Sequence, residues 1–315
     1  MENRRSFCHK SMLGLAALAL HSGISCKSKK EEIENIKTSS LNLSLAQWSL
    51  HKAFFAKELD PVNFAPITAS YDIKAVEYVN QFYSEYANDE PFWMEMKQRA
   101  DGEGVKSLLI MVDDEGLLGD PNAEKRKEAA TNHQKWVNAA KLLECHSIRV
   151  NAFGSGTKDE MKDYLVDGLG QLCEYSSQEG IHILIENHGL YSSDAQWVTE
   201  VIKAVDSPYL GTLPDFGNWC MNVEWGGTKD GSCTDNYGIY KGVKEFMPNA
   251  KGVSAKSYNF NADGSAKDID YAKMIEVVKS FDYDGYIGIE YEGDELSEPE
   301  GIRATKALIE KVWNG

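Results

Sequence analysis

Three carboxylates each close a short apolar segment of the chain and could do chemistry together. Glu186 ends the segment I-H-I-L-I-E, Asp215 ends T-L-P-D, and Glu290 ends I-G-I-E. Carboxylates crowded in a partly desolvated site raise one another's pKa values unless a cation neutralises them. A divalent ion is the simplest such cation: manganese and magnesium suit carboxylate and water ligands, and a neighbouring histidine would admit zinc or cobalt. The three are therefore candidate metal ligands, although a carboxylate in such a position also commonly caps a helix or pairs with a lysine.

Further side chains at the ends of similar segments are candidates for catalysis or for substrate binding. Lys256 is a candidate catalytic residue, with an ion pair to a neighbouring carboxylate as the alternative. The candidate substrate-binding residues are Trp48, His51, Glu77, Arg149, His188 and Asn218. For Glu77 and Arg149 the competing interpretation is an internal salt bridge, and for Trp48 it is core packing.

The elements that must position these residues follow one another at regular intervals. Eight short apolar or β-branched runs begin 28 to 42 residues apart, which is the length of a strand with its crossover helix. The runs begin near Leu43, Ile73, Val105, Ser147, Ile181, Tyr209, Ala250 and Gly285. Helical periodicity between them predicts helices over residues 123–144, 158–179, 271–281 and 301–313.

This alternation predicts a single α/β domain over residues 41–315, a (β/α)8 TIM barrel. A doubly wound open sheet is the rival architecture. The chain lacks both a G-x-G-x-x-G after the first run and a G-x-x-x-x-G-K-[ST], so the rival has no support from a nucleotide-binding motif. A barrel places its chemistry at the C-terminal ends of its strands, where the candidate residues stand.

The charge of the chain narrows its partners. Its 315 residues include 33 Lys and Arg against 49 Asp and Glu, a formal net charge of −16. Nucleic-acid backbones and anionic membranes both bind basic faces, so neither is expected as the main partner. A hydrophobic fraction of 42% is enough for a core that needs no structural zinc ion.

The first 25 residues are predicted to be a signal peptide. Residues 4–7 read R-R-S-F and an apolar run covers residues 12–20, a pattern that resembles a twin-arginine export signal. Residues 23–26 read G-I-S-C and resemble a lipobox, so Cys26 is predicted to carry a lipid and to begin a flexible tether over residues 26–40. The protein is therefore expected to be exported, either periplasmic or anchored to the membrane at Cys26. A chance apolar segment is the alternative.

Four cysteines lie beyond Cys26. None belongs to a C-x-x-C or C-x-x-x-H cluster, so a structural zinc site is not expected. Cys220 and Cys233 fall in one glycine-containing segment, residues 219–236, which is also a candidate lid. Spacing alone does not decide between a disulfide and two free thiols.

Taken in order, the motifs of the chain resemble the xylose isomerase-like TIM barrels of the sugar phosphate isomerase/epimerase superfamily. The motifs are I-E-N-H-G at 185–189, P-D-F-G-N at 214–218, V-S-A-K-S-Y at 253–258, I-D-Y at 269–271 and G-Y-I-G-I-E-Y-E-G at 285–293. The resemblance covers residues 43–313, nearly all of the expected mature chain.

The resemblance implies a divalent ion held at the ends of strands five to eight. Carried over position by position, its ligands are Glu186, Asp215, the residue at position 254 and Glu290. Two positions depart from the family pattern. Ser254 stands where the family has a histidine ligand, and Asn218 stands where it has a substrate-binding histidine. One metal ligand is therefore missing, or is supplied by water, substrate or a neighbouring side chain.

The chemistry that the resemblance implies is proton transfer next to a carbonyl group of a sugar or keto-sugar, through an enediolate. In that scheme the ion polarises the carbonyl, and Glu186 or Glu290 moves the proton. Lys256 would stabilise the oxyanion and take over part of the missing histidine's role. The candidate substrate-binding residues would contact the sugar.

A sugar isomerase or epimerase is therefore the first hypothesis. A lyase or hydrolase acting on keto-sugars or glycosides with the same site is the second, and a non-catalytic carbohydrate-binding lipoprotein is the third. A DNA-repair endonuclease shares the barrel of this superfamily, but the net charge of −16 and the predicted export signal speak against it. Barrels of this family often pair, so the resemblance leaves a homodimer open.

Overall fold

The computed structural model describes residues 40–229, 231 and 233–315 of the chain. The signal peptide predicted over residues 1–25, the predicted lipidation site Cys26 and the predicted tether up to residue 39 lie outside the described residues. Among the residues described, eight strands are found, and each begins within three residues of the run that predicted it. They are β1 (Asn42–Ala46), β2 (Ala75–Val79), β3 (Lys106–Met111), β4 (Ser147–Asn151), β5 (His182–Glu186), β6 (Leu210–Leu213), β7 (Val253–Ser257) and β8 (Tyr286–Tyr291).

All the strand pairings are parallel, and they join the strands in the order β6-β5-β4-β3-β2-β1-β8-β7. The ladder between β1 and β8 connects the first strand to the last. The ends of the series, β6 and β7, meet through isolated parallel bridges of Thr212 with Ala250 and of Asp215 with Ser254. Closure of the sheet therefore brings Asp215 next to Ser254.

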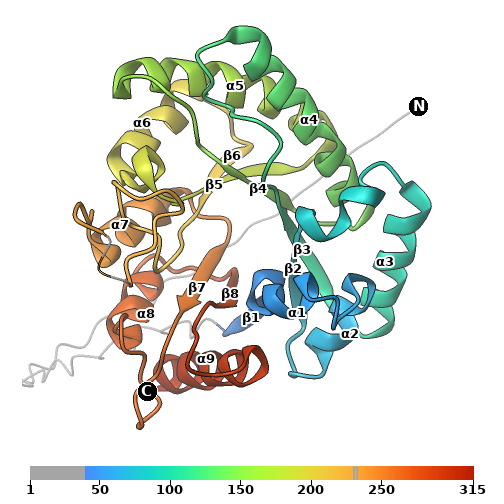
Figure 1. Ribbon diagram of the computed structural model, residues 1–315, viewed down its shortest axis with the longest axis vertical. Helices are drawn as coiled ribbons and strands as arrows, with labels where there is room; N and C mark the ends of the chain where they lie inside the picture. The colour runs from blue at the N-terminus through green and yellow to red at the C-terminus, as the bar shows by residue number, and fades with distance from the viewer. Residues whose placement is uncertain (1–39, 230, 232) are drawn as a thin grey trace, which may run out of the picture. The chain divides into compact units, whose positions relative to one another are not determined.

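Helices follow the strands and succeed one another around them in chain order (Figure 1). In the part of the chain that the structure describes they are α1 (His51–Phe55), α2 (Phe64–Ala69), α3 (Glu90–Gly102), α4 (Ala123–Leu142), α5 (Lys158–Glu179), α6 (Ala195–Val205), α7 (Ile239–Phe246), α8 (Tyr271–Lys279) and α9 (Glu298–Asn314). The predicted (β/α)8 barrel is confirmed.

Local signals in the sequence set the ends of α5 and α9, the helices that follow β4 and β8. Thr157 and Glu160 form a capping box at the start of α5, and Ser297 and Glu300 form another at the start of α9. Each box satisfies backbone N–H groups that have no partner inside the helix. At the other end of α5, Gly180 takes a left-handed conformation with φ 75°, which only glycine adopts without strain.

Two apolar clusters divide the core. The larger cluster lies between the strands and the helices and includes most of the buried apolar side chains. The smaller one comprises Ala46, Val79, Leu109, Met111, Leu184 and Leu213, with Trp48 and Phe82 packed against it. Side chains two positions apart on a strand share a face. Leu184 therefore shares its face with Glu186, which is the last residue of β5, and the apolar cluster lies directly below the charged end of the barrel.

A search of the described residues for membrane-spanning segments finds no helix with the length and hydrophobicity that a crossing requires.

Candidate active site

The three carboxylates that end late strands converge. Glu186 ends β5, Asp215 follows β6, and Glu290 lies in β8, and one carboxylate oxygen from each lies within 4.8 Å of the other two. The side chains are buried, with exposed fractions of 1%, 0% and 4%. Three like charges at this distance and burial require neutralisation by protons, by cationic side chains or by a bound ion.

Ser254 links two of the three carboxylates. Its Oγ lies 2.6 Å from Asp215 Oδ2 and 2.6 Å from Glu290 Oε2. A hydroxyl has one proton and donates to one oxygen at a time, so this pair of contacts needs a second proton. Burial raises the pKa of Asp215 well above its usual range, with Glu290 and Glu186 adding to the effect. The Asp215 carboxyl is therefore the group best placed to supply that proton when no other cation is bound.

Lys256 neutralises the same side of the cluster. Its Nζ lies 2.5 Å from Glu292 Oε1, 3.0 Å from Glu290 Oε1 and 3.7 Å from Asp215 Oδ2, and the residue is 1% exposed. Burial alone would lower the pKa of Lys256, but the three carboxylates outweigh it and raise the pKa well above its usual range. The lysine is therefore a buried cation at the centre of an acidic group.

Arg149 neutralises the opposite side. Its Nη1 donates to Asp113 Oδ1 at 2.6 Å, and its Nε lies 2.8 Å from Glu186 Oε2. The second contact lacks hydrogen-bond alignment, and Glu186 Oε2 accepts no hydrogen bond from any described residue. Burial raises the pKa of Glu186 to about 7 despite the arginine, whereas at Asp113 the arginine overcomes burial and lowers the pKa. Glu186 thus keeps a buried oxygen that faces the arginine without an aligned hydrogen bond, and a pKa near neutrality.

His188 is held as a neutral imidazole. Its Nδ1 lies 2.7 Å from Asn151 Oδ1, and the amide of Asn151 donates in turn to Asp113 Oδ1 at 2.6 Å. Burial lowers the pKa of His188 to about 3, and Arg149 adds to the effect. Because Asn151 presents its oxygen, Nδ1 carries the proton and Nε2 keeps its lone pair as an acceptor.

A cavity of about 430 Å³ opens at these strand ends. Its wall is formed by Trp48, Gln81, Asp113, Arg149, His188, Asn218, Val223, Glu224, Trp225, Gly227, Lys229, Tyr258, Glu290 and Glu292. Four predicted substrate-binding residues, Trp48, Arg149, His188 and Asn218, therefore lie on the wall. Asn218 also donates to Glu186 Oε1 at 3.3 Å, which ties the wall to the carboxylates behind it.

Two predicted substrate-binding residues lie behind the wall. His51 stacks on the Trp48 ring, with 4.7 Å between ring centroids, and its Nδ1 lies 2.6 Å from the Trp48 carbonyl oxygen. Glu77 is 2% exposed and accepts a hydrogen bond of 2.6 Å from Ser44 Oγ. Burial raises the pKa of Glu77 to about 8. In this structure His51 supports the Trp48 wall, and Glu77 is a buried acid inside the barrel.

The loop between β6 and α7 covers one side of the cavity. Cys220 and Cys233 form a disulfide in this loop, which answers the question that their spacing left open. Trp225, between them, packs its ring edge on His188 with 4.9 Å between centroids. Gly226 approaches the Gly189 backbone so closely that a Cβ would lie 2.6 Å from its nitrogen. The predicted lid segment is therefore docked against the strand ends.

The structure also identifies wall residues that the sequence interpretation did not select, among them Asp113, Tyr258 and Trp225. Asp113 follows the apolar run of β3, so the rule that found the other three carboxylates also applies to it. Tyr258 directly follows β7 and ends the motif V-S-A-K-S-Y, so the strand-end rule also applies to it. Trp225 has no comparable local signal, because it reaches the cavity through the path of the loop between β6 and α7.

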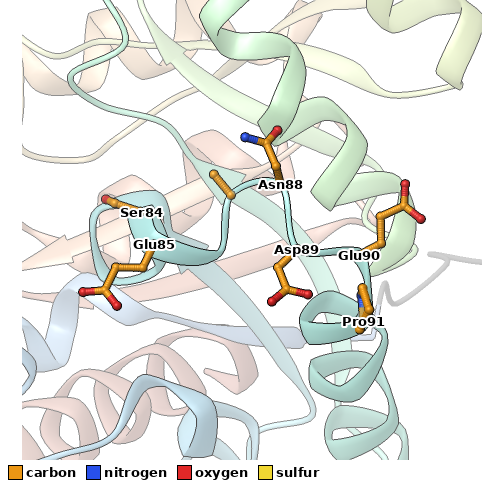
Figure 2. Close-up of a pocket in the computed structure, with 7 residues that line it drawn as sticks. Ser84, Glu85, Asn88, Asp89, Glu90 and Pro91 are labelled. Atoms are coloured by element: carbon orange, nitrogen blue, oxygen red, sulfur yellow. The ribbon is translucent and has the colours of Figure 1, made fainter.

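A separate depression, which shares no lining residue with the cavity at the strand ends, lies within residues 84–91 before and at the start of α3 and has a volume of about 550 Å³. It is open and acidic. Figure 2 shows the carboxylates of Glu85, Asp89 and Glu90 pointing apart, so they do not converge on a common ligand. This depression therefore offers no convergent site.

Comparison with known proteins agrees with the architecture. Residues 66–312 match the family model described as "Xylose isomerase-like TIM barrel". No curated protein sequence matches the chain significantly. Similar solved structures include 3-keto-D-glucoside 4-epimerase from E. coli, with 14% identity, a TM-score of 0.66 and coverage of 86% of this chain and 100% of that chain.

Two further structures are similar to this chain. D-psicose 3-epimerase from Clostridium cellulolyticum H10 has 15% identity and a TM-score of 0.66, and the match covers 87% of this chain and 99% of that chain. A sugar phosphate isomerase/epimerase from Parabacteroides distasonis has 13% identity and a TM-score of 0.62, with coverage of 87% and 94%. At sequence identities of 13–15%, the similarity to these structures shows that the chain shares their fold.

Proposed function

Because the chain belongs to the xylose isomerase-like TIM barrel family, we propose that it isomerises or epimerises a sugar or keto-sugar by moving a proton on a carbon next to a carbonyl group. The observation that carries the proposal is a pair of carboxylates, each beside a buried cationic side chain: Glu290 on the wall of a 430 Å³ cavity, and Glu186 directly behind the wall residue Asn218. Such a reaction needs a base for the C–H proton and a positive group for the oxygen, and both are present here. The named relatives, a 3-keto-D-glucoside epimerase and a D-psicose epimerase, agree with this reaction class.

Glu186 is the candidate base. Its pKa of about 7, raised by burial, is close to the value at which a general base works best near neutral pH. Its Oε2 accepts no hydrogen bond within the described part of the chain, so a lone pair is free to accept a proton. Glu290, on the cavity wall, is the candidate for returning a proton in an epimerisation.

Lys256 and Arg149 are the candidate stabilisers of negative charge on the substrate oxygen. The two side chains are 1% and 4% exposed, so water screens their charge weakly. Arg149 lies on the cavity wall, and Lys256 reaches it through Glu290 and Glu292. Both are already in place before a substrate binds, which is the arrangement that stabilises a transition state most effectively.

The three convergent carboxylates fit a divalent ion. They offer carboxylate oxygen donors, one from each residue, within 4.8 Å of one another. Manganese, magnesium, cobalt and zinc all accept such donors. Glu186, Asp215 and Glu290 would hold the ion, which when bound would polarise the substrate carbonyl.

The cavity wall offers the contacts that a sugar requires. Trp48 and Trp225 present aromatic surface on which the C–H groups of a sugar ring can pack. His188 Nε2 is available to accept a hydrogen bond from a hydroxyl, and the Asn218 amide can exchange hydrogen bonds with another. A few polar groups on a largely apolar wall fix the orientation of a small ligand.

We also propose that the protein is exported and anchored through a lipid at Cys26, on the strength of the N-terminal pattern alone. Cys26→Ser is expected to release the protein from the membrane fraction in cell fractionation. Retention of the variant in that fraction would contradict the anchor.

The reaction is tested by incubating the protein with ketoses, aldoses and 3-keto-glucosides in D₂O and following the products by NMR. An isomer or epimer that carries deuterium next to the carbonyl is expected, and Glu186→Gln should lower the rate of its formation by ~10²–10⁴-fold. Glu174→Gln, an exposed position on α5, is the matched control and should leave the rate unchanged. A dehydrated product or a free aglycone would favour the lyase or hydrolase alternative, and saturable binding without any product would favour a carbohydrate-binding protein.

A further inference from the structure

The carboxylates that could hold a metal ion are already contacted by a cation of the chain itself. Lys256 Nζ lies 3.0 Å from Glu290 Oε1 and 3.7 Å from Asp215 Oδ2. Both carboxylates belong to the metal-binding candidates. The lysine is 1% exposed, so its ammonium group has no access to bulk water in place of these partners.

A divalent ion and this ammonium group would be close neighbours. An ion bound at the usual ~2.0–2.4 Å from the oxygens that Lys256 contacts would lie within about 6 Å of Nζ. Two positive charges at this separation in a buried site repel strongly. An ion can therefore bind only against the field of the lysine.

Ser254 adds to this competition. Its hydroxyl contacts Asp215 Oδ2 and Glu290 Oε2, both at 2.6 Å, and so occupies one oxygen of each prospective ligand. These contacts and those of Lys256 together form a closed network. The network would have to open at Asp215 and Glu290 for an ion to enter.

Glu292 gives the lysine a partner outside the three metal-binding candidates. Its Oε1 lies 2.5 Å from Lys256 Nζ. The ammonium can therefore keep one carboxylate if an ion takes the others. The geometry is that of a competition between two cations rather than of a permanent block.

We propose that Lys256 and a divalent ion compete for Asp215 and Glu290, so that this chain binds metal weakly and the lysine sets the affinity. The inference deepens the proposed function, on which it rests for the identity of the metal-binding carboxylates. The lysine in this view is a built-in counter-cation that keeps the carboxylate cluster folded and neutralised when no metal is present.

The test is a titration of the full chain with Mn²⁺ in the absence of sugar. Binding is measured by calorimetry and by the EPR signal of free Mn²⁺. Lys256→Met keeps the length of the side chain and removes its charge, and is expected to bind Mn²⁺ at least ~10-fold more tightly than wild type. Lys256→Arg keeps the positive charge, so its Mn²⁺ affinity should stay as weak as that of wild type. Lys141→Met, which removes an exposed lysine paired with Glu179, is the control and should match wild type.

Equal affinities for wild type and Lys256→Met would overturn the proposal, as would the absence of Mn²⁺ binding in both. Removing Lys256 leaves buried carboxylates without their partner, so this variant could be unstable. In that case its folding is followed by circular dichroism with and without Mn²⁺. Folding that is restored by Mn²⁺ supports the competition, and failure of Mn²⁺ to restore it contradicts it.

This measurement is independent of the reaction. It uses no substrate and reads only metal affinity and folding. If the protein turns over no sugar but shows the predicted order of Mn²⁺ affinities, the competition is supported and the proposed activity is refuted. If it turns over a sugar but wild type and Lys256→Met bind Mn²⁺ equally, the activity is supported and the competition is refuted.

Discussion

The two halves of the barrel mouth handle buried charge in different ways. In the late half, formed by β5 to β8, Glu186, Asp215 and Glu290 crowd together with Ser254 and Lys256. In the early half, formed by β1 to β4, the charged groups are spread apart. There Arg149 pairs with Asp113, and Glu77 accepts a hydrogen bond from a serine.

The difference shows where a barrel can place chemistry. A cluster of buried like charges is stable only when protons or cations neutralise it, and clusters of this kind concentrate at binding and catalytic sites. A buried acid such as Glu77, whose hydrogen-bond partner is a serine, instead stays neutral because burial raises its pKa. The late half is therefore expected to carry the reaction, and the early half to support the walls of the cavity and their stability.

The largest effect should come from removing a proton-transfer group in the late half. Glu186→Gln and Glu290→Gln should each lower turnover by ~10²–10⁴-fold, because the loss of a general acid or base has effects of this size. Glu77→Gln, in the early half, should stay within a few-fold of wild type. Steady-state rates on the sugar found by the NMR screen provide the measurement, and full activity of both late-half variants would refute their assignment.

The next largest effect concerns stability. Arg149 bridges the two halves by contacting Asp113 and Glu186. Arg149→Met leaves both carboxylates without their cation and should reduce the free energy of unfolding by ~3–5 kcal/mol. Arg99→Met, which breaks an exposed pair with Glu95 on α3, should cost at most ~1 kcal/mol. Urea denaturation distinguishes the two, and similar losses would mean that the bridge contributes no more than a surface pair.

Glu77 should give the early half its own pH dependence. Its pKa is raised by burial from 4.5 in the unfolded chain to about 8 in the fold, so unfolding between these pH values releases a proton. The contribution of Glu77 to the free energy of unfolding is therefore fully present below about pH 4.5, falls as the pH rises, and is lost above about pH 8. Glu77→Gln should remove roughly 2–5 kcal/mol of that fall. The free energy of unfolding is measured by urea denaturation at several pH values from 5 to 8. If it changed with pH to the same extent in wild type and in Glu77→Gln, the effect would be excluded.

The disulfide tests the lid of the late half. Cys233→Ala frees a loop closed between positions 220 and 233, and should destabilise the protein by ~2–3 kcal/mol. Because Trp225 and Lys229 line the cavity from this loop, KM should rise more than kcat falls. Thiol titration of the denatured chain should find two additional thiols after reduction, and equal counts would show that the cysteines are free.

The smallest effect is expected at the early-half wall. His51→Ala removes the ring stacked behind Trp48 and should raise KM by ~2–10-fold, the size of one aromatic contact. Trp48→Ala removes the wall itself and should have the larger effect. If His51→Ala changed kcat with KM constant, His51 would act in the reaction rather than behind the wall.

Much of the fold was predictable from local patterns. The apolar runs located β1 to β8, and the capping residues Thr157 and Ser297 stand at the starts of α5 and α9. The same strand-end rule selected Glu186, Asp215 and Glu290, and applying it to β3 would have added Asp113. These signals are readable because strand alternation and helix caps involve residues a few positions apart.

The sequence by itself therefore determined the architecture, the family and the acidic strand ends. Only the tertiary structure decided that Lys256 contacts Asp215 and Glu290, that Glu77 lies behind the cavity wall, and that Cys220 and Cys233 are joined. The reason is physical: these contacts join residues from 13 to more than 30 positions apart, and their distances follow from strand register and barrel closure. No short sequence pattern encodes such distances, because they arise when all the strands pair.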